Sequence, residues 1–525
     1  MSRRAARAGT IAALALACGE TDVRVFEPLG IERTPPTVVT EGAGVVEIPV
    51  RLNGRHEQRA VARFRALPGE AQNECQTTDF EPAEGGVEWL PDELEAFVRV
   101  WVGEDELAET DERFLLELTP GEGLPAAPPV ELEIVIRDND RTALVDAADY
   151  GVVPGSESDA ATKLQAVLDD AAGFGRPVVT LPPGDYEMSS VRLPTGATLS
   201  VRGVRWFRPP ASPDDLVTLR VEHAGAENSA PTLVEGLLLD GRRDAQGPYR
   251  EKERENAHLV AAHGDAERGG RIVASFEALE LRSGTGSGVK IGSDADVTLC
   301  RISASALWRD AITATGGATR VRIRSVDSTA TEGTGLWLGP REPGFEGSLV
   351  MDAEAENVLV GAGDVEVEST AGSTVTLRRL TMTRPPFRLD AVDGMVRIVD
   401  SVLMLGLSND GHNHFGPTHD VEITRSTIVA SEFPRAPDEP DEPRAFAAVS
   451  IVPRALAPSP PAEGPGTLLF QDCRFELAGD VETDDLVYAV ESLIDDLGVT
   501  VRGGALGAGF VDWFSPECGA CVREP

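Results

Sequence analysis

Hydrophobic and polar positions alternate in short runs over the first part of the chain, from about Val23 to Asp140. Gly, Pro and Asn residues separate these runs at intervals of about ten residues. Alternating runs bounded by turn formers predict β-strands, and this spacing is typical of an antiparallel β-sandwich. The clearest runs are VVEIPVRL, VARFRAL, FVRVWV, FLLEL and VELEIVI.

The second part of the chain has a different pattern, in which strand-like runs recur with a regular period. The period is about 21 to 25 residues, which is one turn of a parallel β-helix. Leucine-rich repeats would place Leu at fixed offsets, and propeller blades need about 40 residues each. The runs that set the period begin at Val273, Val297, Val321, Val375, Val396 and Val421.

One helix is predicted in the second part, from Ala160 to Ala172, with Asp159 placed to cap its start. Such a helix is expected to cover the first coil, because the end of a solenoid otherwise exposes its core and strand edges. The residues of its apolar face are Leu164, Val167, Leu168 and Ala171.

The length of 525 residues predicts two or more domains. Residues 432–466 are rich in proline and acid, so we expect them to form a loop inserted in the β-helix. The expected segments are a signal peptide (1–17), a tether (18–22), the sandwich (23–140), a linker (141–145), the β-helix (146–515) and a tail (516–525).

The formal net charge of −39 argues against nucleic acid and anionic membrane surfaces as partners, because phosphates would be repelled. The charge suits cations and neutral or basic partners. Lys163, Lys252 and Lys290 are the only lysines in the sequence, which removes most candidates for a catalytic lysine.

The first eighteen residues have the features of an export signal. Arg3, Arg4 and Arg7 precede a short apolar run that ends at Cys18. The ending Leu-Ala-Leu-Ala-Cys resembles a bacterial lipoprotein signal, although Ala15 stands where that family usually has Leu. The resemblance implies lipidation of Cys18; the alternative is an ordinary cleaved signal with an incidental cysteine.

Export also affects the five remaining cysteines. Cys518 and Cys521 form a C-x-x-C, which we interpret as a local disulfide because no second pair of zinc ligands lies nearby. Cys300 and Cys473 lie in apolar runs and are expected to be buried. The pairing of Cys75, Cys300 and Cys473 stays open.

Acidic residues are concentrated in two turns of the predicted sandwich. The segment from Gly103 to Glu112 carries Asp105, Glu109 and Asp111, and the second turn contains Asp138 and Asp140. Carboxylates packed this densely repel one another unless they are solvated or surround a hard cation. Ligands that are all oxygens at high charge density favour Ca²⁺.

At this point the chain resembles the Calx-β family. The resemblance runs through Glu41-Gly42, Asp79-Phe80, GGVEWLPDE, GEDELAETDERFLLEL and Asp138-Asn139-Asp140. It implies a Greek-key β-sandwich that holds Ca²⁺ at one end, although Glu104 stands where calcium-sensing members often have a second aspartate. The ligands it implies are Glu41, Asp79, Asp105, Glu109, Asp111, Asp138 and Asp140.

The segment DAADYGVVPGSESDAATKLQAVLDDAAGFGRPVVTLPPGDYEM resembles the opening of pectate-lyase-superfamily proteins. The resemblance implies a right-handed parallel β-helix with an N-terminal capping helix, so the fold class is all-β throughout. The ordered catalytic motifs of polygalacturonases and pectate lyases are not found, and fold alone does not give activity.

Candidate chemistry in the β-helix falls in two places. Trp308, Arg309 and Trp337 offer aromatic and cationic groups for binding a sugar, and Asp310, Asp410 and His412 are candidate catalytic residues. The alternative interpretation makes Trp308 a core residue, pairs Arg309 with Asp310 at a turn, and treats residues 409–419 as an ordinary turn.

We therefore expect an exported cell-envelope protein, anchored by lipid in the outer membrane or at the cell surface. Its Calx-β module would bind Ca²⁺, and its β-helix would bind polysaccharide or mediate adhesion. Two alternatives remain open at this point: a polysaccharide lyase or glycoside hydrolase that acts in the groove of the β-helix, and a structural spacer without catalytic activity.

Overall fold

The computed structural model describes residues 29–524 outside a set of short segments. These segments are 70–78, 82, 156–158, 211–216, 223–229, 247–256, 265–269, 318, 330, 332, 340–349, 362, 370–371, 385–386, 392–393, 408–419, 433–444, 452–466, 479–485, 493–497, 509 and 515–520. The predicted signal peptide, Cys18 and the tether lie outside the described residues. Among the helices that are described, none has the length and apolar character needed to cross a membrane.

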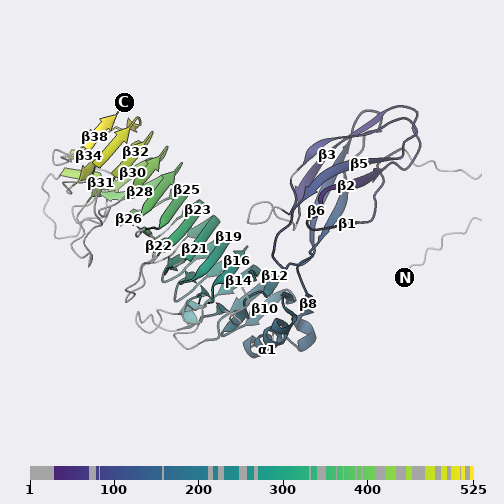
Figure 1. The fold of residues 1–525 in the computed structure, drawn as a ribbon, viewed down its shortest axis with the longest axis horizontal. Coiled ribbons are helices and arrows are strands. Elements are labelled where there is room, and N and C mark those ends of the chain that lie inside the picture. The colour runs from purple at the N-terminus through teal and green to yellow at the C-terminus, as the bar shows by residue number, and fades with distance from the viewer. Residues whose placement is uncertain are drawn as a thin grey trace, which may run out of the picture.

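Residues 31–140 form a β-sandwich of two sheets, as predicted (Figure 1). The larger sheet has the order β1-β7-β6-β3-β4, in which β1 lies beside β7 and β6 lies beside β3, and the smaller sheet pairs β2 with β5. The strands are β1 (Thr37–Thr40), β2 (Gly44–Arg51), β3 (Ala60–Pro68), β4 (Glu84–Trp89), β5 (Glu95–Val102), β6 (Glu112–Pro120) and β7 (Val130–Arg137).

The core of the sandwich follows from the alternation of its strands. In β5 every second residue is buried, and the intervening residues, Phe97 and Trp101 among them, face solvent. The rings of Phe80 and Phe114 stack with their centroids 4.3 Å apart. The buried Trp89 donates its indole hydrogen to the carbonyl of Val50 at 3.2 Å, so its one polar group is satisfied.

The rest of the chain is a right-handed parallel β-helix, in which every strand pair in the described residues is parallel. Successive coils pair in register, so that Leu299, Ile323 and Ala355 stack in the core. The largest described sheet runs in the order β10, β12, β14, β16, β17, β19, β21, β23, β25, β27, β28, β29, β30, β32, β33, β35, β36, β38, β8 and β9.

The strands of this largest sheet are β8 (Ala143–Asp146), β9 (Pro177–Thr180), β10 (Gly184–Glu187), β12 (Thr198–Phe207), β14 (Thr232–Asp240), β16 (Ile272–Glu277), β17 (Glu280–Arg282), β19 (Ala295–Ser305), β21 (Thr319–Thr329), β23 (Met351–Val360), β25 (Thr374–Met382), β27 (Met395–Val399), β28 (Val402–Leu407), β29 (Val421–Thr424), β30 (Thr427–Glu432), β32 (Thr467–Gln471), β33 (Arg474–Leu477), β35 (Gly498–Arg502), β36 (Ala505–Leu506) and β38 (Cys521–Glu524).

Two further sheets complete the coils. One contains β11 (Val191–Pro194), β13 (Leu219–Glu222), β15 (Val260–Ala262), β18 (Val289–Ile291), β20 (Ile312–Thr315), β22 (Leu336–Gly339), β24 (Val365–Ser369) and β26 (Phe387–Ala391). The other contains β31 (Ala445–Ile451), β34 (Leu486–Ser492) and β37 (Phe510–Phe514).

Each coil turns a corner of the largest sheet at one left-handed residue. Arg301, Ser325, Asn357 and Arg379 hold this position in four successive coils, with φ between 52° and 56°. A single residue in this conformation bends the strand without breaking the register on either side of it. The guanidinium of Arg379 donates to the side chain of Asn357 at 2.5 Å, and this bond links the left-handed residues of two successive coils.

The predicted capping helix is present as α1 (Ala161–Ala171), and its expected apolar face is buried. The carboxylate of Asp159 accepts a hydrogen bond from the backbone N–H of Ala161 at 2.9 Å. The short 3₁₀ segments η1 (Ala147–Tyr150) and η2 (Ala172–Phe174) flank the first coil, and η3 (Arg243–Ala245) follows β14.

Three predicted boundaries need correction. The expected linker 141–145 overlaps β8, which pairs with β9 in the first coil, and the expected tail contains β38, which pairs with β35. The expected inserted loop 432–466 contains β31, which pairs with β34. In each case a short strand completes a coil, because an unpaired strand edge would leave backbone hydrogen bonds unmade.

We expect Leu377→Ala to destabilise the β-helix by about 2 to 5 kcal/mol, because Leu377 is fully buried in the core and its removal leaves a cavity. Leu359→Ala is the matched control: Leu359 lies on the neighbouring coil with its side chain 36% exposed. Its substitution should cost less than about 1 kcal/mol. Guanidinium unfolding followed by circular dichroism measures both, and equal losses would contradict this description of the core.

Candidate metal centre

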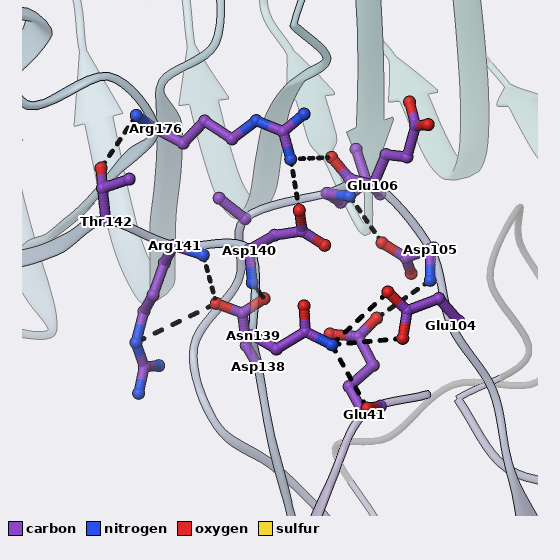
Figure 2. Close-up of polar contacts among 12 residues, drawn as sticks. Glu41, Glu104, Asp105, Glu106, Asp138, Asn139, Asp140, Arg141, Thr142 and Arg176 are labelled. Atoms are coloured by element: carbon purple, nitrogen blue, oxygen red, sulfur yellow. Dashed lines mark hydrogen bonds and ion pairs between the residues drawn. The ribbon is translucent and has the colours of Figure 1, made fainter. Parts of the chain in front are cut away.

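Acidic side chains converge at the end of the sandwich where β1, β5 and β7 end (Figure 2). Glu41 follows β1 directly, Asp105 lies in the loop after β5, and Asp138 and Asp140 follow β7. Asp79 stands beside the end of β5, where its carbonyl accepts from the N–H of Gly103 at 2.9 Å. The topology therefore brings together carboxylates that are up to a hundred residues apart in sequence.

Two groups of carboxylates are compact enough to hold a cation. Glu41, Asp105 and Asp140 form the first group, and Asp79, Asp105 and Glu109 form the second. In each group the ligand oxygens lie within 4.8 Å of one another. Asp105 belongs to both groups, so it is the central residue of the centre.

Backbone N–H groups hold these carboxylates in place. The N–H of Asp105 donates to Glu41 at 3.1 Å, and the N–H of Leu107 donates to Asp105 at 2.6 Å. Asp138 accepts from the N–H groups of Asp140 and Arg141, at 3.1 and 2.9 Å. Asp138 thus shapes the turn that presents Asp140, and it lies outside both compact groups of the described residues.

Asp111 has a different position from the other predicted ligands. Its carboxylate forms an ion pair with Arg141 at 2.6 Å, and Arg141 also donates to the carbonyl of Glu109 at 3.1 Å. Asp111 belongs to neither compact group. The sequence places it two residues from Glu109, but the start of β6 turns it toward the arginine instead.

Burial and mutual repulsion raise the pKa values of the central carboxylates. Burial raises the pKa of Glu41 to about 8, and the charge of Asp105 adds to the shift. Burial likewise raises the pKa of Asp105 to about 7, although the hydrogen bond from Leu107 opposes it. The pKa of Glu109 lies well above its ordinary value, chiefly because of burial. These groups are poorly accommodated as bare anions.

The donor set fits a hard divalent cation. All candidate ligands are carboxylate oxygens, which Ca²⁺ prefers. One oxygen of Asp140, Oδ2, is buried and has no hydrogen-bond partner in the described residues, although the other, Oδ1, pairs with Arg176. A buried anionic oxygen without a partner is costly, and a cation at this point would satisfy it.

The loop that carries Asp105 also contacts the β-helix. Arg176, which precedes β9, donates to the carbonyl of Glu106 at 3.3 Å, and Thr198 of β12 donates to the carbonyl of Ala108. Arg202, at the bend within β12, lies 3.4 Å from the carboxylate of Glu112 in the sandwich. The acidic end therefore lies at the junction of the two domains, as Figure 1 also shows.

The β-helix contributes two carboxylates of its own to this junction. Glu235 in β14 and Glu277 in β16 pair in register on successive coils, and they are only 5% and 3% exposed. Arg202 lies 3.2 Å from Glu235, and the hydroxyl of Ser275 donates to Glu277 at 2.9 Å. Burial raises the pKa of Glu277 to about 7, and Glu235 adds to the shift.

Sequence reasoning missed Glu112, Glu235 and Glu277. Burial raises the pKa of Glu112, and its interactions with Asp79 and Glu109 add to the effect. The two β-helix residues also raise the pKa of Glu109 across the junction. The sequence does contain a signal for Glu235 and Glu277: each is a glutamate within an otherwise apolar run, TLVEGLLLD and VASFEALEL. Nothing in these runs indicates which element covers them.

Asp310, a candidate catalytic residue of the β-helix, makes hydrogen bonds within the β-helix itself. Asp310 is 7% exposed and accepts hydrogen bonds from the hydroxyl of Thr313 at 2.8 Å and the N–H of Thr334 at 3.0 Å. These bonds join two coils at a turn, where the alternative interpretation expected Asp310 to pair with Arg309. Asp410 and His412 lie outside the described residues.

Trp308, Arg309 and Trp337 are all half-buried rather than in the core. Trp308 has the guanidinium carbon of Arg243 at 5.8 Å from its ring centroid. The ammonium of Lys290 lies 6.0 Å from the ring centroid of Trp337, two strands away in the same sheet. Each of these two tryptophan rings therefore has a cationic side chain beside it, in a protein that is strongly acidic overall.

Part of the cysteine pairing that the sequence left open is decided by the structure. Cys300 is fully buried, but it is disulfide-bonded rather than a free thiol. It pairs in register with Glu277, on the face that the sandwich covers. Cys473 is free and buried, as expected. Cys521 is disulfide-bonded, while its predicted partner Cys518 lies outside the described residues.

Residues 28–140 match the model of the Calx-beta domain family, which confirms the resemblance over about a fifth of the chain. The calcium binding domain CBD12 of CALX1.1 is 26% identical with a TM-score of 0.19; the match covers 21% of this chain and 47%, less than half, of that structure. No curated protein matches the chain.

Two solved enzymes match larger parts of the chain. The A-module of the Azotobacter vinelandii mannuronan C-5 epimerase AlgE4 is 14% identical with a TM-score of 0.42, covering 73% of this chain and 100% of that one. The Yersinia enterocolitica family 28 exopolygalacturonase is 10% identical with a TM-score of 0.41, covering 94% and 97%.

In calcium-free buffer, we expect the melting temperature of the sandwich to fall as the pH rises from about 5 to about 8. Glu41 and Asp105 have ordinary pKa values of 4.5 and 3.8, and in the folded chain these rise to about 8 and about 7. The folded state therefore binds more protons than the unfolded state in this range. Its stability is fully present below the ordinary values and is lost as the pH passes through the raised ones.

Scanning calorimetry with EGTA at several pH values measures this dependence. Asp105→Asn should flatten the profile, because one of the titrating carboxyls is gone. CaCl2 should flatten it too, since the cation takes the place of the protons. A melting temperature that stays constant or rises with pH in EGTA would contradict the burial of these carboxylates.

Proposed function

We propose that this protein is an exported calcium-binding surface protein, in which Ca²⁺ fastens the Calx-β sandwich to a polysaccharide-binding β-helix. The observation that carries the proposal is the sharing of Asp105 by two compact carboxylate groups. These groups lie at the loop that contacts the β-helix. Binding of a cation at one end of the sandwich would therefore act on the junction of the domains.

The charges at the domain junction support the proposal that Ca²⁺ holds the sandwich against the β-helix. Glu109 and Glu112 approach from the sandwich, Glu235 and Glu277 approach from the β-helix, and Arg202 bridges Glu112 and Glu235. One guanidinium cannot neutralise all of these carboxylates. Ca²⁺ takes six to eight oxygens, so it would replace repulsion between the domains by shared attraction. Extracellular modules bind it with dissociation constants of about 10⁻⁴ to 10⁻³ M.

Export and anchoring rest on the N-terminal sequence. The cationic start, the apolar run and Cys18 support a lipoprotein signal, and the outer membrane or the cell surface is then the place of the anchor. Extracellular Ca²⁺ is abundant enough to load a site of millimolar affinity. The charge of −39 would keep the protein away from anionic membrane surfaces beyond its lipid.

Polysaccharide binding is supported by one face of the β-helix. Lys290, Thr313 and Trp337 stand in one column of three adjacent strands, in which Lys290 and Trp337 are half-buried and Thr313 is buried. Burial lowers the pKa values of the nearby His258 and His263 to about 3 and about 4, and the charge of Lys290 contributes in both cases. Local positive potential beside an aromatic ring suits an anionic sugar chain. We assign no catalytic role to Asp310, because its carboxylate is committed to a turn.

Asp105→Asn is expected to weaken calcium binding at least about tenfold, because it removes a charged ligand from both groups. Asp111→Asn is the matched control in the same loop: its carboxylate pairs with Arg141 outside the groups, so its calcium affinity should stay near that of the wild type. Isothermal titration of the full chain with CaCl2 measures both. Equal effects of the two variants, or no heat from the wild type, would contradict the calcium site.

Trp337→Ala is expected to reduce retention of the full chain on an immobilised acidic polysaccharide, because the ring and its cation are lost together. Trp101→Ala is the control, since Trp101 is an exposed tryptophan on the sandwich, away from this face. Affinity electrophoresis in gels containing alginate or pectate compares the two variants. Retention that Trp337→Ala leaves unchanged would argue against this face as the binding surface.

A further inference from the structure

A cleft of about 230 Å³ lies between the acidic loop of the sandwich and the outer face of the β-helix. It is smaller than the pockets of about 300 to 1,000 Å³ that take drug-sized ligands, so it suits a single small unit. Its lining residues are Asp105, Glu106 and Leu107 from the sandwich, and Pro231, Val273, Ala274, Ser275, Asp296, Thr298 and Arg322 from the β-helix.

Thr298 is the least expected residue of the cleft. It is 1% exposed, and its hydroxyl has no hydrogen-bond partner in the described structure. It occupies an outward-facing position of β19, between Ser275 and Arg322 on the adjacent coils. A buried hydroxyl without a partner costs about 1 to 3 kcal/mol. A ligand in the cleft would supply the missing partner.

The charged residues that the β-helix contributes to the lining are Asp296 and Arg322. Arg322, Arg271 and Arg320 surround Asp296 at 3.2, 3.5 and 3.7 Å. Arg320 also lies 3.5 Å from Asp352, and Arg322 is paired in register with Glu354 on the next coil. Because three guanidinium groups share Asp296, Arg322 has N–H donors left from which an acid group of a ligand can accept hydrogen bonds.

The opposite wall presents Asp105, the residue that both compact carboxylate groups share. A carboxylate accepts hydrogen bonds from hydroxyl groups, and a cation that it holds takes further oxygen ligands. Leu107, Pro231 and Val273 provide apolar surface between the two polar walls. One ligand must therefore combine an acid group, hydroxyl groups and an apolar ring face.

We infer that this interdomain cleft seats one acidic sugar unit, with its carboxylate toward Arg322 and its hydroxyls toward Thr298 and Asp105. The inference rests on the proposed polysaccharide-binding function and gives it a second contact point, distinct from the column of Lys290 and Trp337. Both domains build the seat, so neither domain alone would bind the unit.

The experiment titrates the full chain in CaCl2 with sodium D-glucuronate and, separately, with D-glucose, followed by ligand-observed NMR or calorimetry. We expect saturable binding of glucuronate and much weaker binding of glucose. Thr298→Val and Arg322→Gln should each weaken glucuronate binding about 3- to 10-fold, since each removes one hydrogen-bonding group.

The chain offers matched controls in the same column of the same sheet. Arg322 pairs with Glu354, Glu354 with Thr376, and Thr376 with Arg397, so Thr376 and Arg397 lie beyond the cleft on the same outer face. Thr376→Val and Arg397→Gln should leave glucuronate binding unchanged. Equal effects of cleft and control variants, or equal affinity for glucose and glucuronate, would overturn the inference.

Failure of the cleft and failure of the proposed function give different results. If the wild type takes up calcium and is retained by polysaccharide, but glucuronate binding is absent or ignores Thr298→Val and Arg322→Gln, only the cleft is overturned. If calcium titration and polysaccharide retention both fail, the proposed function is overturned, and the cleft inference falls with it.

Discussion

Repulsion between buried carboxylates is the constraint on which the arrangement of this protein depends. Glu41, Asp105 and Asp140 are gathered at one end of the sandwich, where burial holds the pKa values of Glu41 and Asp105 near neutrality. Glu235 and Glu277 of the β-helix add negative charge across the junction. Protons or arginines must balance these charges, which makes the domain junction sensitive to pH, and under the proposed function a divalent cation would take their place.

The β-helix supplies the platform for this coupling. Parallel pairing in register stacks residues of successive coils, so side chains on the outer face form columns, such as the one from Ser275 through Thr298 to Arg322. The sandwich covers only the first coils, where the column is rich in hydroxyl and acidic groups. Farther along, arginines and glutamates alternate on the same face and pair between coils, as Arg378 and Glu354 do at 3.8 Å.

The β-helix has two separate candidate binding sites because the sandwich covers only part of its outer surface. Where the loop of Asp105 meets the face, a small cleft remains between the domains. On a different sheet, the ammonium of Lys290 lies 6.0 Å from the ring centroid of the half-buried Trp337.

The sequence by itself indicated the two fold types, the longest strands of both, the capping helix and most of the central carboxylates. Alternation and a repeat of about 24 residues are local signals, because they reflect which face of each strand is buried. Glu41, Asp79, Asp105, Glu109 and Asp140 were found because the family pattern fixes their loops. Only the tertiary structure showed that Asp111 pairs with Arg141, that Cys300 is bonded, and that Glu235 and Glu277 join the centre. Those outcomes depend on which domain surface covers which strand, and no local pattern in the chain encodes a contact between distant faces.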